Sequence, residues 1–235
     1  MSSKSEIINQ YKKKIILLKK HNKLYFNKDN PKITDSQYDN LKREIFDLEK
    51  KNNFLKKLNL NKRLVGSTPS NKFKKIKHLK PMLSLSNAFD KGDMNDFLKK
   101  INNFLNTNDK DIELSSEPKI DGISATLIYE QGILTKGLSR GDGIIGEDIL
   151  ENLKTIKELP REIKDAPDLL EIRIEVYIGK KNFENLKDKF ANPRNAASGS
   201  LRQKNSEETK KIPLKFIAYT FGFEKGLKAK NQTDF

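Results

Sequence analysis

The chain of 235 residues carries 47 Lys and Arg against 32 Asp and Glu, a formal net charge of +15, and its length suits one sizeable domain with a small appendage. It has no cysteine, no apolar signal core and no apolar run as long as a membrane span, which excludes disulfides and cysteine-bound zinc in this stretch and predicts a soluble, cytoplasmic protein. A surface this basic favours a polyanionic partner such as nucleic acid. Drift in codon composition explains the abundance of Lys, Asn and Ile equally well.

The first third of the chain is predicted to form two helices. Apolar residues recur at three- and four-residue steps, stop at a polar break at 29–31, and then resume with the same spacing. Thr34 and Gln37 have the spacing of a capping box, which predicts that the second helix begins there. The two apolar stripes are Ile7, Ile8, Tyr11, Ile15 and Leu18, then Tyr38, Leu41, Ile45 and Leu48. We therefore predict a small helical hairpin over residues 1–66, followed by a linker at 66–70.

The remainder, residues 67–235, is predicted to be mainly extended. One further helix is expected over 94–105, and alternation of apolar and polar residues then predicts antiparallel strands. The strands are expected at 123–129, 133–139, 171–178 and 214–221. A turn at 130–132 folds the first two strands into a hairpin. The hairpin brings Arg140, which follows the second strand, back toward Lys119, which precedes the first. The fold class is therefore α+β, with a helical module followed by a mainly antiparallel domain.

A lysine stands at the mouth of the first predicted strand, in the run Glu117-Pro118-Lys119-Ile120-Asp121-Gly122. A lysine that is desolvated and surrounded by fixed charges loses its proton more easily, and the neutral amine is a nucleophile. The alternative is an ordinary solvated surface lysine. Arg140 and Glu175 are expected at strand ends or on one polar face near it.

Five stretches of the chain resemble the N-terminal part of bacterial NAD-dependent DNA ligases. They occur in the family's order and at roughly its spacing over nearly the whole chain. The stretches are ITDSQYD (33–39), HLKPMLSL (78–85), EPKIDG (117–122), SRGDG with GED (139–143, 146–148) and FANPRNAASGSLRQ (190–203). The resemblance implies a helical NAD-binding module and an adenylation, or nucleotidyltransferase, domain that is incomplete at its C-terminus.

The resemblance also implies a reaction. Lys119 would attack the α-phosphorus of NAD, release nicotinamide mononucleotide and keep AMP as a phosphoramidate, for transfer to the 5′-phosphate of a nick in double-stranded DNA during replication and repair. Attack at neutral pH requires a lysine pKa well below the usual ~10.4. Arg140 would help to lower that pKa and hold phosphate or sugar oxygens. Glu175 would contact the ribose hydroxyls or help to place a metal. Mg²⁺ or Mn²⁺ is implied, because the charge of phosphoryl transfer needs neutralising.

Further contacts are carried over from the family by position. Glu117 would lie at the adenine end, and Ser84 and Leu85 would contact the adenosine side. Asp121 would orient the lysine or support the turn before Gly122.

The helical module would close over the nicotinamide half of NAD. Aromatic rings stack on a pyridinium and carboxylates attract its charge, and the matching positions are Tyr25, Asp35, Tyr38 and Asp39. Three alternatives stay open: Tyr38 belongs to the helical core, Arg140 pairs with Asp142 in its turn, and Glu175 is a surface ladder partner of Arg173.

The chain departs from the family at two positions and at its end. Phe26 stands where the family commonly has His or Tyr, and Ile174 where it usually has Gly. The family's later Asp-Gly strand motif and downstream lysines are absent, so we expect that this chain cannot complete ligation alone. We also expect it to be a monomer. Two other interpretations remain: a nucleotidyltransferase that uses ATP or GTP, and a catalytically silent, basic nucleic-acid-binding protein.

Overall fold

The protein is described by a computed structural model that covers residues 3–24, 32–58, 73–85, 87–107 and 112–226. The chain forms two compact units, one of Met1–Met82 with Asp121–Phe235 and one of Leu83–Ile120. The polar break at 29–31 and the linker at 66–70 lie outside the described residues.

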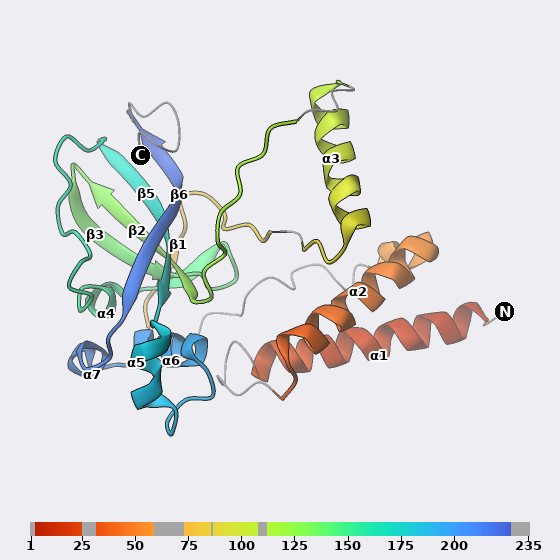
Figure 1. Ribbon diagram of the computed structural model, residues 1–235, viewed down its shortest axis with the longest axis horizontal. Coiled ribbons are helices and arrows are strands. Elements are labelled where there is room, and N and C mark those ends of the chain that lie inside the picture. Colours follow the sequence, from red (N-terminus) through yellow and green to blue (C-terminus); the bar gives the residue numbers. More distant parts are fainter. Residues whose placement is uncertain (1–2, 25–31, 59–72, 86, 108–111, 227–235) are drawn as a thin grey trace. The chain divides into compact units, whose positions relative to one another are not determined.

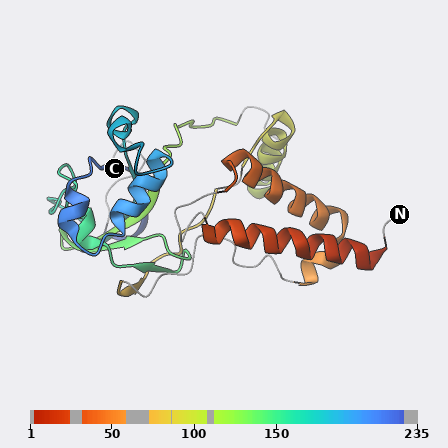
Figure 2. The same cartoon turned by 90° about the horizontal axis from the view of Figure 1, so that it is seen from below.

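The N-terminal helices form the predicted hairpin. Helix α1 (Lys4–Asn22) and helix α2 (Asp35–Lys51) lie side by side (Figures 1 and 2), and a 3₁₀ helix η2 (Asn53–Leu58) follows. Both helices begin with a capping box, in which the cap side chain and the third helical residue each accept a hydrogen bond from the other's backbone N–H. The predicted stripes meet between the helices, with Tyr11, Ile15, Leu18, Leu41 and Ile45 buried.

Four antiparallel strands form the main sheet, in the order β3-β2-β5-β6 (Figure 1). The strands are β2 (Ile123–Glu130), β3 (Ile133–Ser139), β5 (Leu169–Tyr177) and β6 (Lys215–Lys225). Gln131 and Gly132 connect β2 to β3 with φ values of 52° and 80°. Two central residues with positive φ match the twist of a two-residue hairpin. The predicted hairpin is therefore confirmed, and β6 continues four residues beyond its predicted end.

One face of the sheet is covered by short helices. The elements are α4 (Leu150–Leu153), α5 (Lys180–Phe183), η3 (Glu184–Leu186), α6 (Pro193–Leu201) and α7 (Ser206–Lys210). Alternate residues of β2 and β5 enter a core with α4, α5 and α6, including Leu127, Ile172, Val176, Leu153 and Ala197. Strands β1 (Lys75–Lys77) and β4 (Ile145–Glu147) pair separately as a two-stranded sheet.

Helix α3 (Lys91–Leu105) belongs to the second unit and corresponds to the helix predicted over 94–105. It begins three residues earlier, because the Asp90 side chain accepts a hydrogen bond from the Asp93 N–H at 2.9 Å and so caps the first turn. It ends at Asn106, whose φ of 52° turns the chain away from the helix.

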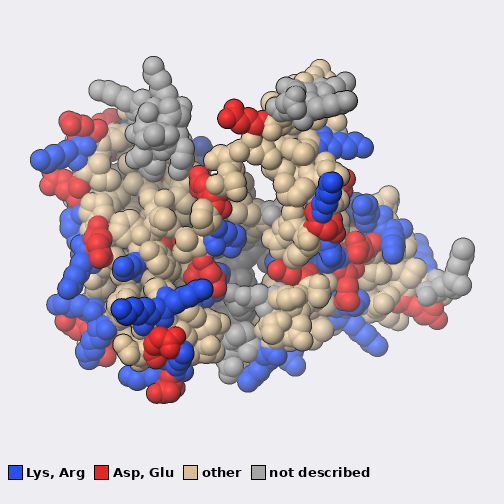
Figure 3. Space-filling model, in the orientation of Figure 1, with Lys and Arg blue, Asp and Glu red and all other residues tan. Residues whose placement is uncertain are grey.

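The mixture of helices and antiparallel strands confirms the α+β class. Among the described residues, no helix is both long and apolar enough to cross a membrane. In Figure 3 the Lys and Arg side chains lie scattered over the face in view and are interspersed with Asp and Glu. On this face the basic charge is therefore spread, as it is along the sequence.

Candidate active site

The face of the sheet opposite the core carries polar side chains where β2 and β5 pair. Residues directly opposite each other in an antiparallel pair share a face, and the register sets Ser124 opposite Glu175. The Ser124 hydroxyl donates a hydrogen bond to Glu175 Oε2 at 2.6 Å. Both residues are half-buried, so the Glu175 carboxylate is oriented near the beginning of β2.

Gly122 precedes β2 at a point where only glycine fits. A Cβ on this residue would lie 2.3 Å from the Val176 carbonyl oxygen and 3.1 Å from Glu175 Cγ. The missing side chain therefore lets the backbone approach β5 beside Glu175. The structure thus gives a steric reason for glycine at the turn that Asp121 was predicted to support.

Asp121 has a partner that the sequence did not indicate. Arg194, the second residue of α6, donates a hydrogen bond from Nη1 to Asp121 Oδ1 at 3.1 Å. Helix α6 is fixed locally by Asn192, whose side chain accepts from the Asn195 N–H at 2.7 Å, and by Pro193 in its first turn. Arg194 lay within a recognised sequence stretch, but a pair separated by 73 residues leaves no local signal.

Arg140 lies directly after β3, where the hairpin prediction placed it. Burial lowers the pKa of its guanidinium, the neighbouring Tyr219 and Glu175 act to raise it, and Arg194 acts to lower it. The Asp142 carboxylate accepts hydrogen bonds from the N–H groups of Ile144 and Ile145 at 2.9 and 2.8 Å. Asp142 therefore supports the turn itself.

Tyr219 on β6 joins the same cluster. Partial burial raises the pKa of its phenol, a hydrogen bond with Ser124 opposes this rise, and the Glu175 carboxylate adds to it. Arg140 also acts on the phenol and lowers its pKa. Sequence reasoning did not single out Tyr219, and the only signal was its position within the strand predicted at 214–221.

The structure corrects the expected environment of β5. Alternation along the strand sets Glu171, Arg173 and Glu175 on its polar face, and the alternative interpretation had Arg173 as a surface ladder partner of Glu175. Glu171 is fully buried and Arg173 is 4% exposed, because the segment after β1 covers this part of the face. Burial alone would raise the pKa of Glu171, but its bonded neighbours, including Arg173 and two backbone N–H groups, outweigh burial and lower it.

Ile174 is also buried, in the core on the opposite face of β5. The residue that departs from the family pattern therefore points away from Ser124 and Glu175, because successive residues of a strand alternate between faces.

The other predicted nucleotide contacts belong to the second unit. Lys119, Glu117, Ser84 and Leu85 are all exposed, in segments without regular secondary structure. Lys119 stands two residues before Asp121 in the sequence. Arg140, Glu175 and Asp121 therefore belong to the first unit, whereas Lys119, Glu117, Ser84 and Leu85 belong to the second.

In the helical module, Tyr38 and Asp39 lie on α2, and Asp35 is its first residue. The Tyr38 hydroxyl donates a hydrogen bond to the Asn22 side chain across the hairpin. The Lys42 ammonium lies 4.6 Å from the centroid of the Tyr38 ring. Tyr38 thus takes part in the helical packing, as its alternative interpretation held. Tyr25 and Phe26 lie outside the described residues.

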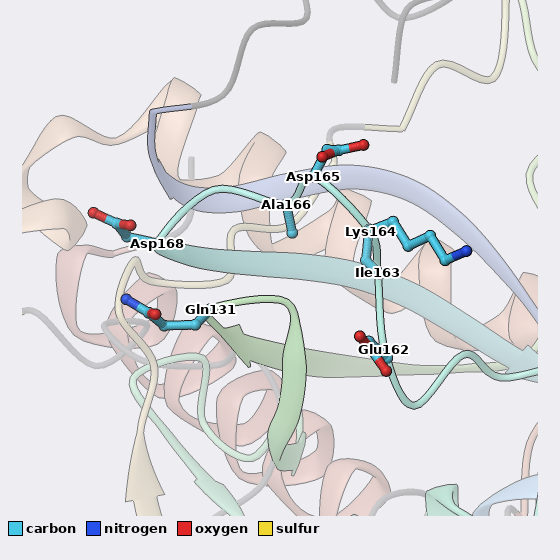
Figure 4. Close-up of a pocket in the computed structure, with 7 residues that line it drawn as sticks. All are labelled: Gln131, Glu162, Ile163, Lys164, Asp165, Ala166 and Asp168. Atoms are coloured by element: carbon cyan, nitrogen blue, oxygen red, sulfur yellow. The ribbon is translucent and has the colours of Figure 1, made fainter.

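A shallow pocket lies at the other end of the sheet, around the β2–β3 turn and the loop before β5 (Figure 4). Its lining residues are Gln131, Glu162, Ile163, Lys164, Asp165, Ala166 and Asp168. Since β2 separates this turn from Ser124, the pocket is distinct from the cluster at the beginning of β2.

Comparison with known proteins gives two family matches. The model of the NAD-dependent DNA ligase adenylation domain matches residues 70–235, and that of the DNA ligase-like, N-terminal NAD+-binding domain matches residues 4–58.

Curated relatives with the name DNA ligase are similar to most of the chain. The protein of Pelagibacter ubique (strain HTCC1062) is 58% identical over 229 residues, which cover 96% of this chain and 34% of the relative. That of Rickettsia massiliae (strain Mtu5) is 48% identical over 210 residues, 86% of this chain and 30% of the relative. That of Rickettsia bellii (strain OSU 85-389) is 45% identical over 241 residues, 97% of this chain and 35% of the relative. The chain thus spans about a third of the length of the curated relatives it matches.

Proposed function

The chain belongs to the NAD-dependent DNA ligase family, and from this premise we propose that it carries out the adenylation step, in which Lys119 becomes covalently linked to AMP. The observation that supports this most directly is that both the N-terminal segment and the longer remainder of the chain match modules of NAD-dependent or related DNA ligases. The same matches favour NAD over ATP or GTP as the nucleotide donor.

In the proposed step, the neutral Lys119 amine attacks the phosphorus of the adenylate half of NAD. A nitrogen–phosphorus bond forms while the bond from that phosphorus to the bridging oxygen breaks. Nicotinamide mononucleotide leaves with the bonding electron pair, and one of the two protons on the lysine nitrogen passes to solvent. The enzyme then carries AMP as a phosphoramidate that can be passed to a phosphate.

The cluster on the sheet supplies groups suited to a nucleotide. The Arg140 guanidinium offers a planar array of donors for phosphate or sugar oxygens. Glu175, oriented by Ser124 at 2.6 Å, accepts hydrogen bonds from ribose hydroxyls. Tyr219 adds an aromatic surface on the same face. Glu117, which belongs to the second unit, is proposed to contact the adenine.

A divalent cation fits this chemistry only in company with the nucleotide. The described residues contain no group of three or more His, Cys, Asp or Glu that could hold a metal, and Glu175 is a single carboxylate already bonded to Ser124. Mg²⁺ is commonly bound by one or two carboxylates together with substrate phosphates. Mg²⁺ or Mn²⁺ would neutralise phosphate charge during transfer, and Glu175 would be its protein ligand in place of a contact with the ribose hydroxyls.

We assign residues 1–66 to the NAD-binding module and residues 67–235 to the adenylation domain. Tyr25, Asp35, Tyr38 and Asp39 are proposed to contact the nicotinamide half, and Ser84 and Leu85 the adenosine. Because the curated relatives are about three times as long, sealing of nicked DNA in replication and repair is proposed for the whole ligase. For this chain we propose only the formation of the lysine–AMP intermediate.

Intact mass spectrometry after incubation with NAD and Mg²⁺ tests the proposal, with ATP in a parallel tube. We expect a gain of one AMP with NAD and none with ATP. Lys119→Ala should abolish the gain, because the nucleophile is removed. Lys211→Ala, a change of another exposed lysine, should retain it. An adduct on the Lys119→Ala protein would refute the assignment of the nucleophile, and an adduct formed only with ATP would refute the choice of nucleotide.

A further inference from the structure

Three ionisable residues lie buried beside the candidate site without belonging to it. His78, Glu171 and Arg173 are 3%, 0% and 4% exposed. Burying charged groups is costly unless each is paired and hydrogen-bonded, and an apolar substitute often gives equal or greater stability. Stability alone therefore does not account for these three residues, and their hydrogen-bond partners indicate their role.

Glu171 and Arg173 hold one short backbone segment. Glu171 accepts hydrogen bonds from the N–H groups of Leu79 and Lys80 at 3.2 and 3.1 Å. Arg173 Nη2 donates to the Lys80 carbonyl oxygen at 2.5 Å and to Glu171 Oε2 at 3.2 Å. The pair thus binds two N–H groups and one carbonyl oxygen of residues 79 and 80, directly after His78.

His78 links this pair to the backbone of Arg140. Arg173 Nη1 lies 3.2 Å from His78 Nδ1, and a guanidinium can only donate, so we assign Nδ1 as the acceptor. The ring proton is then on Nε2, which lies 3.2 Å from the Arg140 carbonyl oxygen and donates to it. A continuous chain of bonds therefore runs from Glu171 through Arg173 and His78 to Arg140.

The loop that follows Arg140 is held by the same segment. The Gly143 N–H donates to the Arg140 carbonyl at 3.0 Å, the His78 N–H to the Ile144 carbonyl at 2.9 Å, and the Met82 N–H to the Gly143 carbonyl at 2.8 Å. The packing beside the ring is close, since a Cβ on Gly146 would lie 3.1 Å from His78 Nε2.

We propose that His78, with Glu171 and Arg173 behind it, is a positioning residue that fixes the backbone at Arg140 and so presents the Arg140 guanidinium for lysine adenylation. The inference rests on the proposed function of the site. His78 acts through Arg140, and its own ring is enclosed by protein. The same bonds also hold Met82, the last residue before the unit that carries Ser84 and Leu85.

Two amide substitutions separate the two sides of the imidazole. Gln places a donor near the former Nε2 and keeps the bond to the Arg140 carbonyl, whereas Asn places its amide near the former Nδ1 and keeps only the contact with Arg173. Thermal unfolding of His78→Gln and His78→Asn first establishes that both variants fold. Their rates of AMP adduct formation at saturating NAD are then compared by intact mass. Amide hydrogen exchange at Gly143 is measured on the same samples.

We expect His78→Asn to form the adduct about three- to tenfold more slowly than wild type, the range for loss of one hydrogen bond, and its Gly143 amide to exchange correspondingly faster. His78→Gln should stay within about twofold of wild type in both measurements. Equal exchange in the two variants would refute the positioning role. Faster exchange with an unchanged adduct rate would refute its part in adenylation. If wild type forms no adduct, the proposed function fails in this chain, and the exchange comparison alone decides the positioning role.

Discussion

Replacing Gly122 by Ala should damage both the sheet and the cluster beside it. The new Cβ would lie 2.3 Å from the Val176 carbonyl oxygen, 3.0 Å from the Val176 carbonyl carbon and 3.1 Å from Glu175 Cγ. Non-bonded heavy atoms settle at about 3.5 Å, so the two backbones would have to separate by roughly 1 Å. That movement falls where Ile123 pairs with Val176, at the start of the β2–β5 ladder.

Overpacking of this kind typically lowers the free energy of unfolding by about 1–3 kcal/mol. For a chain of this size, each kcal/mol lowers the unfolding temperature by about 2–4 °C, which gives a loss of about 2–12 °C for Gly122→Ala. Circular dichroism during heating measures this directly. Because Glu175 is also displaced, the AMP adduct should form more slowly even where the variant is fully folded.

Gly179→Ala is the matched control, since a Cβ there meets nothing within 4 Å. It should leave the unfolding temperature within about 2 °C of wild type, because only a weak helix cap changes. If Gly122→Ala unfolded at the same temperature as Gly179→Ala, the close approach of β2 to β5 would not constrain this position, and the steric argument would be wrong.

Three further predictions concern residues around the site and in the helical module. Tyr38→Ala should raise the NAD concentration needed for half-maximal adduct formation, whereas Tyr38→Phe, which keeps the ring, should leave it unchanged. An equal rise in the two variants would contradict stacking of the ring on NAD and assign Tyr38 to the fold alone. Glu171→Gln should lower the free energy of unfolding at pH 7 by about 3–5 kcal/mol, because a buried pair is broken. Folding lowers the pKa of Glu171 from its ordinary value of 4.5, so the ionised carboxylate stabilises the protein above pH 4.5, and this contribution is lost as the pH falls from 4.5 through the lower, folded value. The variant should therefore lose less stability than wild type below pH 4.5, and parallel curves would contradict this. Ile174→Ala should cost about 2–5 kcal/mol in urea unfolding, whereas Ile16→Ala, at a side chain that is 66% exposed, should cost much less; similar losses would show that Ile174 is not in the core.

Local patterns predicted the longer helices and the strands of the main sheet, but not the short helices α4–α7 or strands β1 and β4. The capping box of Thr34 and Gln37 involves residues three apart, so the sequence contains all of it, and both bonds are present. The β2–β3 hairpin is equally local, since alternation sets its faces and two turn residues set its register.

Long-range burial could not be predicted in the same way. Alternation assigned Glu171 and Arg173 to the polar face of β5, but it cannot reveal that the segment after β1 covers them. The pairing of Arg194 with Asp121 and the approach of Tyr219 to Ser124 likewise depend on how distant strands and helices come together. Resemblance to a family identified the positions of Arg140 and Glu175, while the structure supplied their neighbours.

The outer strand of the sheet has a consequence for handling the protein. In the part of the chain that the structure describes, β6 is the last strand of the main sheet, next to β5, and its exposed side chains include Ile217, Tyr219 and Phe221. An outer strand with exposed apolar side chains favours association between molecules. Two shifts of register along β5 and β6, together with lysines at the two ends of β6, Lys215 and Lys225, counter this tendency without removing it. Concentrated stocks should therefore be checked for slow, concentration-dependent aggregation before any rate is interpreted.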